Sequence, residues 1–187
     1  MIHHPLTVCK GFWEMHRGFT LLELLITVAV LAILLAVAAP SFKNVIETNK
    51  MQRLANELHG FFIQAKSTAV LRRERLWAHV IMSGSSSSDG DWRIELTDNQ
   101  TVNQGTIFFS FSGAPFKGIA VSPSYSSKKI SFDGIHGRPK SGNILFYPVG
   151  RSSNALKLIS HNMSARVRVC SDNRNEESFG YSICAEN

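Results

Sequence analysis

A run of apolar residues from Phe19 to Ala39 constrains the fold of this 187-residue chain more than any other feature. Only Thr20, Glu23 and Thr27 are polar among its 21 residues. Because an α-helix rises about 1.5 Å per residue, a helix of this length spans roughly 30 Å, the thickness of the hydrocarbon core of a bilayer. The sequence therefore predicts a transmembrane helix over residues 19–40, and the acidic Glu23 near its start needs an explanation.

The residues that flank this run predict its orientation. Lys10 and Arg17 precede it, and basic residues favour the cytoplasmic side of a membrane. Residues 1–18 are therefore expected to be a cytoplasmic leader, and everything after Pro40 is expected to be exported.

Cysteine usage is consistent with export of the C-terminal part. Cys9 lies before the run, whereas Cys170 and Cys184 would both reach an oxidising compartment. A disulfide between the latter two would close a loop of about 15 residues and contribute about 3 kcal/mol to the free energy of unfolding. Two free, buried thiols are the alternative.

A cleaved secretory signal and a plain membrane anchor are two simpler interpretations of the run. A signal would use a small-residue site such as Ala36-Val37-Ala38, but the run is longer than a usual signal core and Pro40 follows at once, which hinders cleavage. An anchor tolerates Glu23 if its carboxylate reaches the headgroups. It does not account for the basic residue and glycine that precede Phe-Thr-Leu-Leu-Glu.

Residues 17–23, Arg-Gly-Phe-Thr-Leu-Leu-Glu, resemble the processing site of type IV prepilins and type II secretion pseudopilins. In those proteins a dedicated peptidase cuts after the glycine and methylates the new N-terminus. The resemblance implies cleavage between Gly18 and Phe19 and N-methylation of Phe19. It also assigns assembly roles to Phe19, to Glu23 at the fifth mature position and to Pro40 at the twenty-second.

This processing gives Glu23 a physical role. Cleavage creates an ammonium group at Phe19, one helical turn from Glu23, so both charges lie at the tip of an apolar helix. When several such helices bundle, Glu23 of one subunit can accept the ammonium of a neighbour. The attraction is strong at low dielectric, but the cost of desolvation is also large, so we expect the pair to set register and assembly order more than stability.

The resemblance also implies location and partners. It places the protein in the bacterial inner membrane as a single-pass protein with its C-terminal domain in the periplasm, and then in a pilus or pseudopilus. The expected partners are major and minor pilin subunits, the prepilin peptidase and the inner membrane.

Helical periodicity continues beyond Pro40, which lacks an N–H group and should kink the helix. Apolar residues recur at spacings of three and four, which predicts one helix from about Phe19 to Arg72. Its second half, in the segment 41–75, is expected to lie with its apolar side on a globular domain. The predicted apolar side consists of Phe42, Val45, Ile46, Leu54, Leu58, Phe61, Phe62, Ala65 and Ala69.

From Leu76 the hydrophobic period changes to two, which predicts a β-rich domain over residues 76–187. Strands are expected at residues 76–82, 92–96, 107–111, 118–121, 129–132, 143–147, 156–159 and 166–170. The Ser-rich segment 83–91 has no apolar residue and is expected to be a mobile loop. A long helix followed by many short strands predicts an α+β fold, with the helix packed on antiparallel sheet.

This order of elements resembles the GspH/FimT branch of the pilin-like proteins more than a major pilin. Residues 132–148 and 158–170 are similar to C-terminal segments of FimT and FimU minor pilins. The resemblance implies a minor pilin that lies near the pilus tip and helps to initiate assembly. A type II secretion pseudopilin H, which serves protein export, is the alternative.

Catalytic and metal-binding signatures are missing from the sequence, so no enzyme activity, cofactor or metal is expected. The histidines after the leader have no metal-ligand spacing, and there is no G-x-S-x-G or Walker glycine loop. These histidines are His59, His79, His136 and His161.

Positive charge is concentrated towards the C-terminus. Loss of Lys10, Glu14 and Arg17 with the leader lowers the formal net charge from +6 to +5. Between positions 128 and 168 there are eight basic residues and one acidic residue, Asp133. The basic residues are Lys128, Lys129, Arg138, Lys140, Arg151, Lys157, Arg166 and Arg168.

Arg166 and Arg168 are the strongest candidates for a ligand site in this region. Residues two apart in a strand share a face and lie roughly 7 Å from each other, which suits adjacent phosphates. FimT-type pilins that capture DNA for natural transformation carry a Gly-Arg-x-Arg motif, and residues 165–168 match it except that Ala165 replaces the glycine. Alanine adopts positive φ less readily than glycine.

The predicted partner of this surface is double-stranded DNA, bound through its phosphates without sequence specificity. Arg138 and Lys140, near a Gly-rich turn, would widen the surface. Two alternatives remain. The basic residues either form a solvated face or pair with Asp172, Glu176 and Glu177, or they contact an acidic neighbouring pilin.

Overall fold

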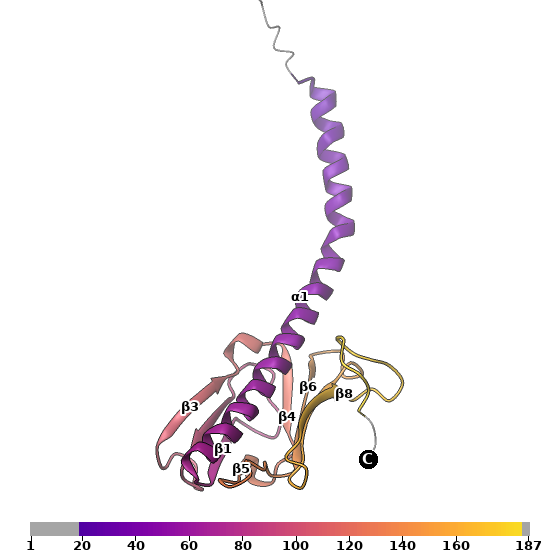
Figure 1. The fold of residues 1–187 in the computed structure, drawn as a ribbon. Helices are drawn as coiled ribbons and strands as arrows, with labels where there is room; N and C mark the ends of the chain where they lie inside the picture. Colours follow the sequence, from indigo (N-terminus) through magenta and orange to yellow (C-terminus); the bar gives the residue numbers. More distant parts are fainter. Residues whose placement is uncertain (1–18, 185–187) are drawn as a thin grey trace, which may run out of the picture. The chain divides into compact units, whose positions relative to one another are not determined.

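The computed structural model describes residues 19–184, without the side chains of residues 37–41. The leader and Gly18 therefore lie outside the described residues. The chain divides into two compact units between Lys43 and Asn44. The elements are α1 (Leu21–Arg72), β1 (Leu76–Ile81), β2 (Arg93–Thr97), β3 (Ile107–Ser112), β4 (Ile119–Pro123), β5 (Lys129–Phe132), β6 (Gly142–Pro148), β7 (Leu156–Ser160) and β8 (Val167–Ser171), with short 3-10 helices at Ala114–Phe116 and Ser126–Lys128 (Figure 1).

The helix α1 begins two residues later than predicted and ends at the predicted Arg72. Its C-terminus is closed by Arg73, which takes a left-handed φ of 53°. The Arg73 and Glu74 N–H groups donate to the carbonyls of Val70 and Ala69, which is the Schellman pattern of helix termination. The chain then turns directly into β1.

The first half of α1 exposes its side chains. All described side chains from residue 19 to residue 36 are exposed. Across the part of the chain that the structure describes, no helical segment combines the length and apolarity of a membrane span. The side chain of Pro40, where a kink is predicted, lies outside the described part.

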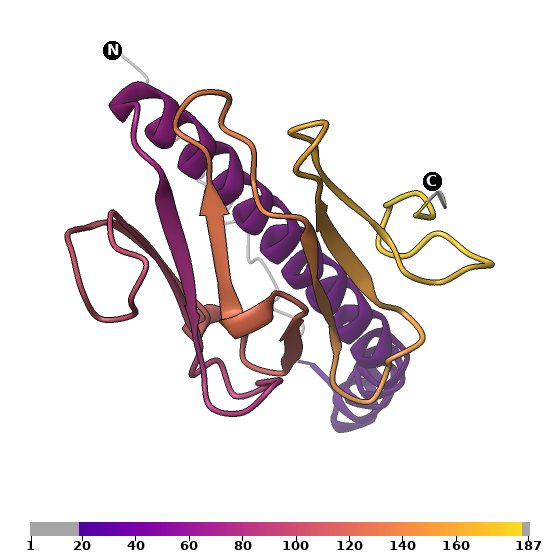
Figure 2. The same ribbon diagram turned by 90° about the horizontal axis from the view of Figure 1, so that it is seen from below.

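Two antiparallel sheets follow the helix. The first sheet has the strand order β3-β2-β1-β5, and the second sheet has the order β4-β6-β7-β8. Figures 1 and 2 show strands of both sheets lying along the C-terminal half of α1. The predicted α+β class, with a long N-terminal helix packed on antiparallel sheets, is confirmed, and each predicted strand is present within two residues of its predicted bounds.

One hydrophobic core joins α1 to both sheets. Phe61 packs against Phe109 of β3 with ring centroids 5.1 Å apart, and Phe62 packs against Phe132 of β5 at 5.7 Å. The prediction that these phenylalanines are core residues is confirmed. The buried side of the helix consists of Met51, Leu54, Ala55, Leu58, Phe61, Phe62, Ala65 and Ala69.

The predicted apolar side was wrong at its N-terminal end. Phe42, Val45 and Ile46 are 65%, 52% and 63% exposed. Periodicity alone marks a helix face, but it does not show where the covering sheet begins, and here burial begins only at Met51.

The Ser-rich segment 83–91 is a loop as predicted, but it is not free of contacts, and its mobility stays a prediction. Ser87 is buried and exchanges backbone hydrogen bonds of 3.1 and 2.8 Å with Val121 of β4. The Gly118 N–H donates to the Ser88 carbonyl at 2.8 Å. The segment thereby covers the open edge of β4, which would otherwise present unpaired backbone groups.

The contribution of the helix to the core can be tested at two adjacent positions. Phe62 is fully buried, whereas Ile63 is 41% exposed. We predict that Phe62→Ala lowers the free energy of unfolding by about 3–5 kcal/mol, because it leaves a cavity between α1 and β5. Urea denaturation of the full chain in non-ionic detergent, followed by the fluorescence of buried Trp92, measures the loss. Ile63→Ala is the control and should cost far less; equal losses would contradict this packing.

Candidate assembly helix and nucleic-acid interface

Thr20 and Glu23 form the first turn of α1. The Glu23 N–H donates to the Thr20 hydroxyl at 3.2 Å, and the Leu24 N–H donates to the Thr20 carbonyl at 3.1 Å. A threonine followed three residues later by glutamate is the sequence pattern of a helix capping box, and a negative charge in the first turn is favourable to the helix dipole. Thr20 therefore caps the helix start through its hydroxyl, a feature that the sequence analysis missed although the Thr-x-x-Glu spacing signals it, and Glu23 places its charge in the first turn.

The predicted processing and assembly residues are only partly described. Phe19 is 70% exposed, and the Glu23 side chain is also exposed. Among residues 19–184, Glu23 makes no ion pair. Gly18 and the side chain of Pro40 lie outside the described part. Cleavage after Gly18, methylation of Phe19 and the assembly roles of Glu23 and Pro40 stay predictions.

The turn between β7 and β8 positions the two candidate arginines. The His161 N–H donates to the Arg166 carbonyl at 2.9 Å and closes the turn. Ala165 within it has a φ of 52°, so the backbone is left-handed although alanine replaces the expected glycine. Lys66 of α1 donates from its ammonium to the Ala165 carbonyl. This lysine, which the sequence analysis passed over, braces the turn from the helix.

Arg166 and Arg168 line one pocket of about 270 Å³, together with His161, Met163 and Ser164. Arg166 is exposed and Arg168 is half-buried. Val167 and Val169 point the other way and pack against the core. The structure therefore brings the two arginines to one face of the second sheet, as their spacing predicts.

Arg138 and Lys140 do not line that pocket, and their part in a wider basic surface stays a prediction. Arg138 is exposed in the connection between β5 and β6. Lys140 lines a different pocket, beside β1 and β5. Its N–H donates to the Ser131 carbonyl at 2.8 Å, which ties it to β5 instead of β8.

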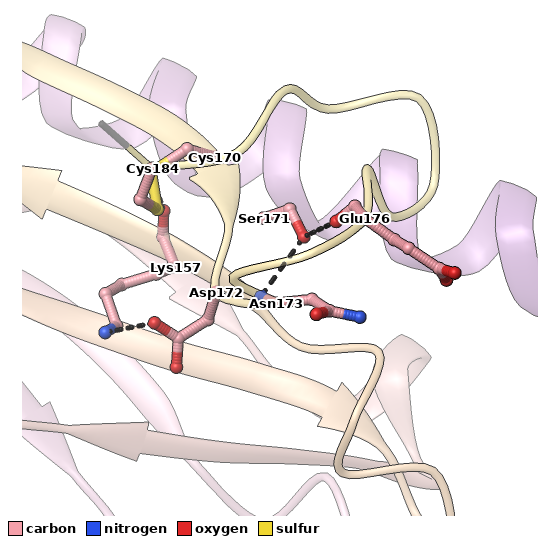
Figure 3. Close-up of a disulfide and its surroundings, with 7 residues drawn as sticks. All are labelled: Lys157, Cys170, Ser171, Asp172, Asn173, Glu176 and Cys184. Carbon is pink, nitrogen blue, oxygen red and sulfur yellow. Dashed lines mark hydrogen bonds and ion pairs between the residues drawn. A yellow bond between two sulfur atoms is a disulfide. The ribbon is translucent and has the colours of Figure 1, made fainter. Parts of the chain in front are cut away.

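Acidic residues neutralise part of the basic region. Lys157 of β7 pairs with Asp172 (Figure 3). Arg151 pairs with Glu47 of α1 at 3.1 Å. The Lys128, Lys129 and Lys140 ammonium groups donate to carbonyl or hydroxyl oxygens, and none of the three forms an ion pair within residues 19–184. Of the tail acids named in the alternative of internal pairing, Asp172 therefore pairs with a basic residue of the region, Lys157.

A disulfide joins Cys170 of β8 to Cys184, which confirms the predicted pairing over free thiols. Figure 3 shows it next to the Lys157–Asp172 pair. The Cys184 N–H donates to the Ser171 carbonyl at 2.9 Å, and the Ser171 N–H donates to the Ser182 carbonyl at 2.8 Å. The C-terminal segment thus covers the edge of β8.

Two groups with shifted pKa values, Tyr125 and Asp133, lie in structural positions. Burial raises the pKa of Tyr125 to about 12, although its hydroxyl shares a 2.7 Å hydrogen bond with Ser160. The backbone N–H of His136, 2.8 Å from the Asp133 carboxylate, lowers the pKa of that carboxyl group. Within residues 19–184 no group of three His, Cys, Asp or Glu side chains is arranged to hold a metal ion.

Comparison with known families identifies the chain. The family model for the prokaryotic N-terminal methylation motif matches residues 15–39, and that for type II transport protein GspH matches residues 54–183. The chain belongs to the GspH family. Its resemblance to the GspH/FimT branch of the pilin-like proteins is confirmed.

Two curated relatives of this GspH-family protein are fimbrial. It is 37% identical over 80 residues to the type IV major fimbrial protein FimA of Dichelobacter nodosus, a match of 42% of this chain and 51% of that protein. It therefore spans about half the length of that relative. It is 28% identical over 126 residues to a fimbrial protein of Pseudomonas aeruginosa, covering 58% of this chain and 78% of that protein.

Solved structures with the same fold include the type IV minor pilin FimU of Pseudomonas aeruginosa. One crystal form matches with a TM-score of 0.55 at 13% identity, over 71% of this chain and 97% of FimU. A second form matches with a TM-score of 0.51 at 12% identity, over 68% and 98%. These matches show that the pilin fold is shared.

Membership of this family has three consequences. Its members are structural pilin-like proteins and not enzymes. The methylation motif indicates membrane anchoring and incorporation into a filament. Pilin-like proteins assemble with other pilins after processing by prepilin peptidase.

The left-handed backbone at Ala165 can be tested by substitution. We predict that Ala165→Gly preserves the free energy of unfolding or raises it by up to about 1 kcal/mol, because glycine adopts positive φ without a steric penalty. Ala165→Val should lower it by about 1–2 kcal/mol, because a β-branched residue is disfavoured there. Urea denaturation measures both. Ala155→Gly is the control and should destabilise; a loss of stability in Ala165→Gly equal to that of the control would contradict the turn geometry.

Proposed function

We propose that this protein is a minor pilin of a type IV pilus, cleaved between Gly18 and Phe19 and N-methylated at Phe19. It leaves the inner membrane, where its C-terminal domain is periplasmic, and enters the pilus near the tip, where it helps to initiate assembly. The observation that carries this proposal is the exposed apolar half of α1, in which Glu23 lies inside the methylation motif and makes no ion pair among the described residues.

The alternative is a type II secretion pseudopilin H that acts in protein export. The name of the matching family model, type II transport protein GspH, fits this alternative. The fimbrial relatives and the fold shared with a type IV minor pilin favour the pilus.

Processing is tested by the intact mass of the mature protein from its native membrane. We predict an N-terminus at Phe19 that carries one added methyl group. An N-terminus at Met1, or one at Ala39 after signal-type cleavage, is incompatible with the proposal. Gly18→Leu is the matched variant and should remain at full length.

The pilus and the secretion roles are separated by fractionation. We predict that the chain is recovered with pili sheared from the cell surface, and that deletion of its gene lowers the number of pili while protein export continues. A chain absent from sheared pili, with export lost on deletion, would instead establish the pseudopilin role.

We also propose that the Arg166 and Arg168 face binds double-stranded DNA. Arg166 is exposed, both arginines line one pocket with His161, and Lys66 braces the left-handed turn that precedes them. Guanidinium groups bind phosphate oxygens in a bidentate manner, and such contacts carry no sequence information.

Gel-shift of a duplex oligonucleotide with the full chain in non-ionic detergent tests this second role. We predict a shift at low salt that is lost steeply as salt rises, and that Arg166→Gln/Arg168→Gln weakens it and lowers the salt slope by about two. Arg93→Gln, which removes an exposed arginine paired with Glu95 on the first sheet, is the control. No shift at low salt, or equal shifts for the double variant and wild type, would contradict duplex binding by the Arg166 and Arg168 face.

A further inference from the structure

A second basic pocket, with an aromatic side chain in its wall, lies on the outer face of the first sheet. Its volume is about 360 Å³. The residues that line it are Arg75, Trp77, Gln100, Lys129, Ser131 and Lys140. Three of them are basic and none is acidic, so the pocket is suited to an anionic ligand.

The sheet and one loop build this pocket. Trp77 of β1 lies opposite Ser131 of β5 and is half-buried, while its neighbours Leu76 and Ala78 point into the core. The loop after β2 folds over His79, the next residue on the same face of β1. The buried His79 ring donates from Nε2 to the Asn99 carbonyl at 2.9 Å. This loop closes one side of the pocket and leaves the Trp77 indole partly accessible.

The cations of the pocket are held in place without being neutralised. The Lys129 ammonium donates to the Gln100 carbonyl at 3.2 Å, and the Lys140 ammonium donates to the Ser126 hydroxyl. In the described part of the chain no ion pair involves either lysine or Arg75. Glu74 precedes Arg75 in the sequence, but its carboxylate oxygen Oε2 lies 3.9 Å from Nε of Arg72.

We propose that this pocket binds single-stranded DNA, with an unpaired base stacked on Trp77 and the flanking phosphates on Arg75, Lys129 and Lys140. An aromatic ring beside uncompensated cations is the arrangement by which proteins hold single strands, since every base has a face that can stack. A duplex keeps its bases stacked on one another, so it cannot fill the Trp77 position without unpairing. The site is separate from the arginine pocket and prefers a different form of DNA.

Fluorescence anisotropy of a labelled oligothymidylate of about 12 nucleotides, titrated with the full chain in non-ionic detergent, tests the proposal. We expect Trp77→Ala to weaken binding about tenfold, in the range found for loss of one base-stacking contact. Trp77→Phe should bind nearly as wild type, because a ring face remains. Ile81→Ala, a truncation on the same face of β1, is the matched control and should leave the affinity unchanged.

A second comparison needs no variant and so does not depend on folding. An abasic oligonucleotide of the same length has the same phosphates but no bases, so wild-type protein should bind it about tenfold more weakly than oligothymidylate. Equal affinity for the two would overturn the proposal and indicate a general polyanion site. Equal binding of oligothymidylate by Trp77→Ala and wild type would overturn it as well.

The single-strand site and the duplex-binding site can be tested separately. Arg166→Gln/Arg168→Gln should leave the oligothymidylate affinity within about twofold of wild type, because the arginines line another pocket. A tenfold loss in this double variant would contradict a separate site at Trp77. If the duplex shows no gel-shift but oligothymidylate binds as expected, the duplex-binding role is contradicted and the single-strand site is supported.

Discussion

The apolar surface of α1 has to be covered along its whole length, and the domain of this chain covers only part of it. From Met51 to Ala69 the apolar side is buried under both sheets. Each large side chain that is fully buried contributes about 1.5–3 kcal/mol, so this stripe is the main reason that the two sheets form one domain. The exposed side chains from residue 19 to residue 36 have no cover within the described chain. We infer that other subunits supply it, which is the physical basis for a filament protein.

The same helix also places the candidate binding surface. Lys66 lies on α1 and donates to the Ala165 carbonyl, in the turn that leads through Arg166 into β8, where Arg168 lies. The disulfide then fixes the far end of that strand to the C-terminal segment. The arginines are therefore supported at both ends, by the helix on one side and by Cys170–Cys184 on the other, and do not depend on a free loop.

Hydrophobic period was sufficient to predict the helix and the positions of the strands, because each element buries one face in the same core. It was not sufficient for three features that depend on pairing between distant segments. Val45 and Ile46 continue the helical period but are exposed, since the sheets begin further along the helix. Ser87 has no apolar neighbours in sequence, yet its backbone completes the edge of β4. Lys140 lies near Arg138 in sequence, but its pairing with Ser131 directs it to the pocket at Trp77.

The central claim is that Glu23 meets the Phe19 ammonium of a neighbouring subunit when helices pack, and Glu23→Ala tests it most directly. Breaking a buried ion pair costs about 3–5 kcal/mol, so the amount of this chain in sheared filaments should fall by more than about tenfold. Folding of the domain should be unchanged, because Glu23 makes no ion pair among the described residues. Glu57→Ala, which removes an exposed acid paired with Arg53 on the same helix, should enter filaments at the normal level. Normal incorporation of Glu23→Ala would contradict the account.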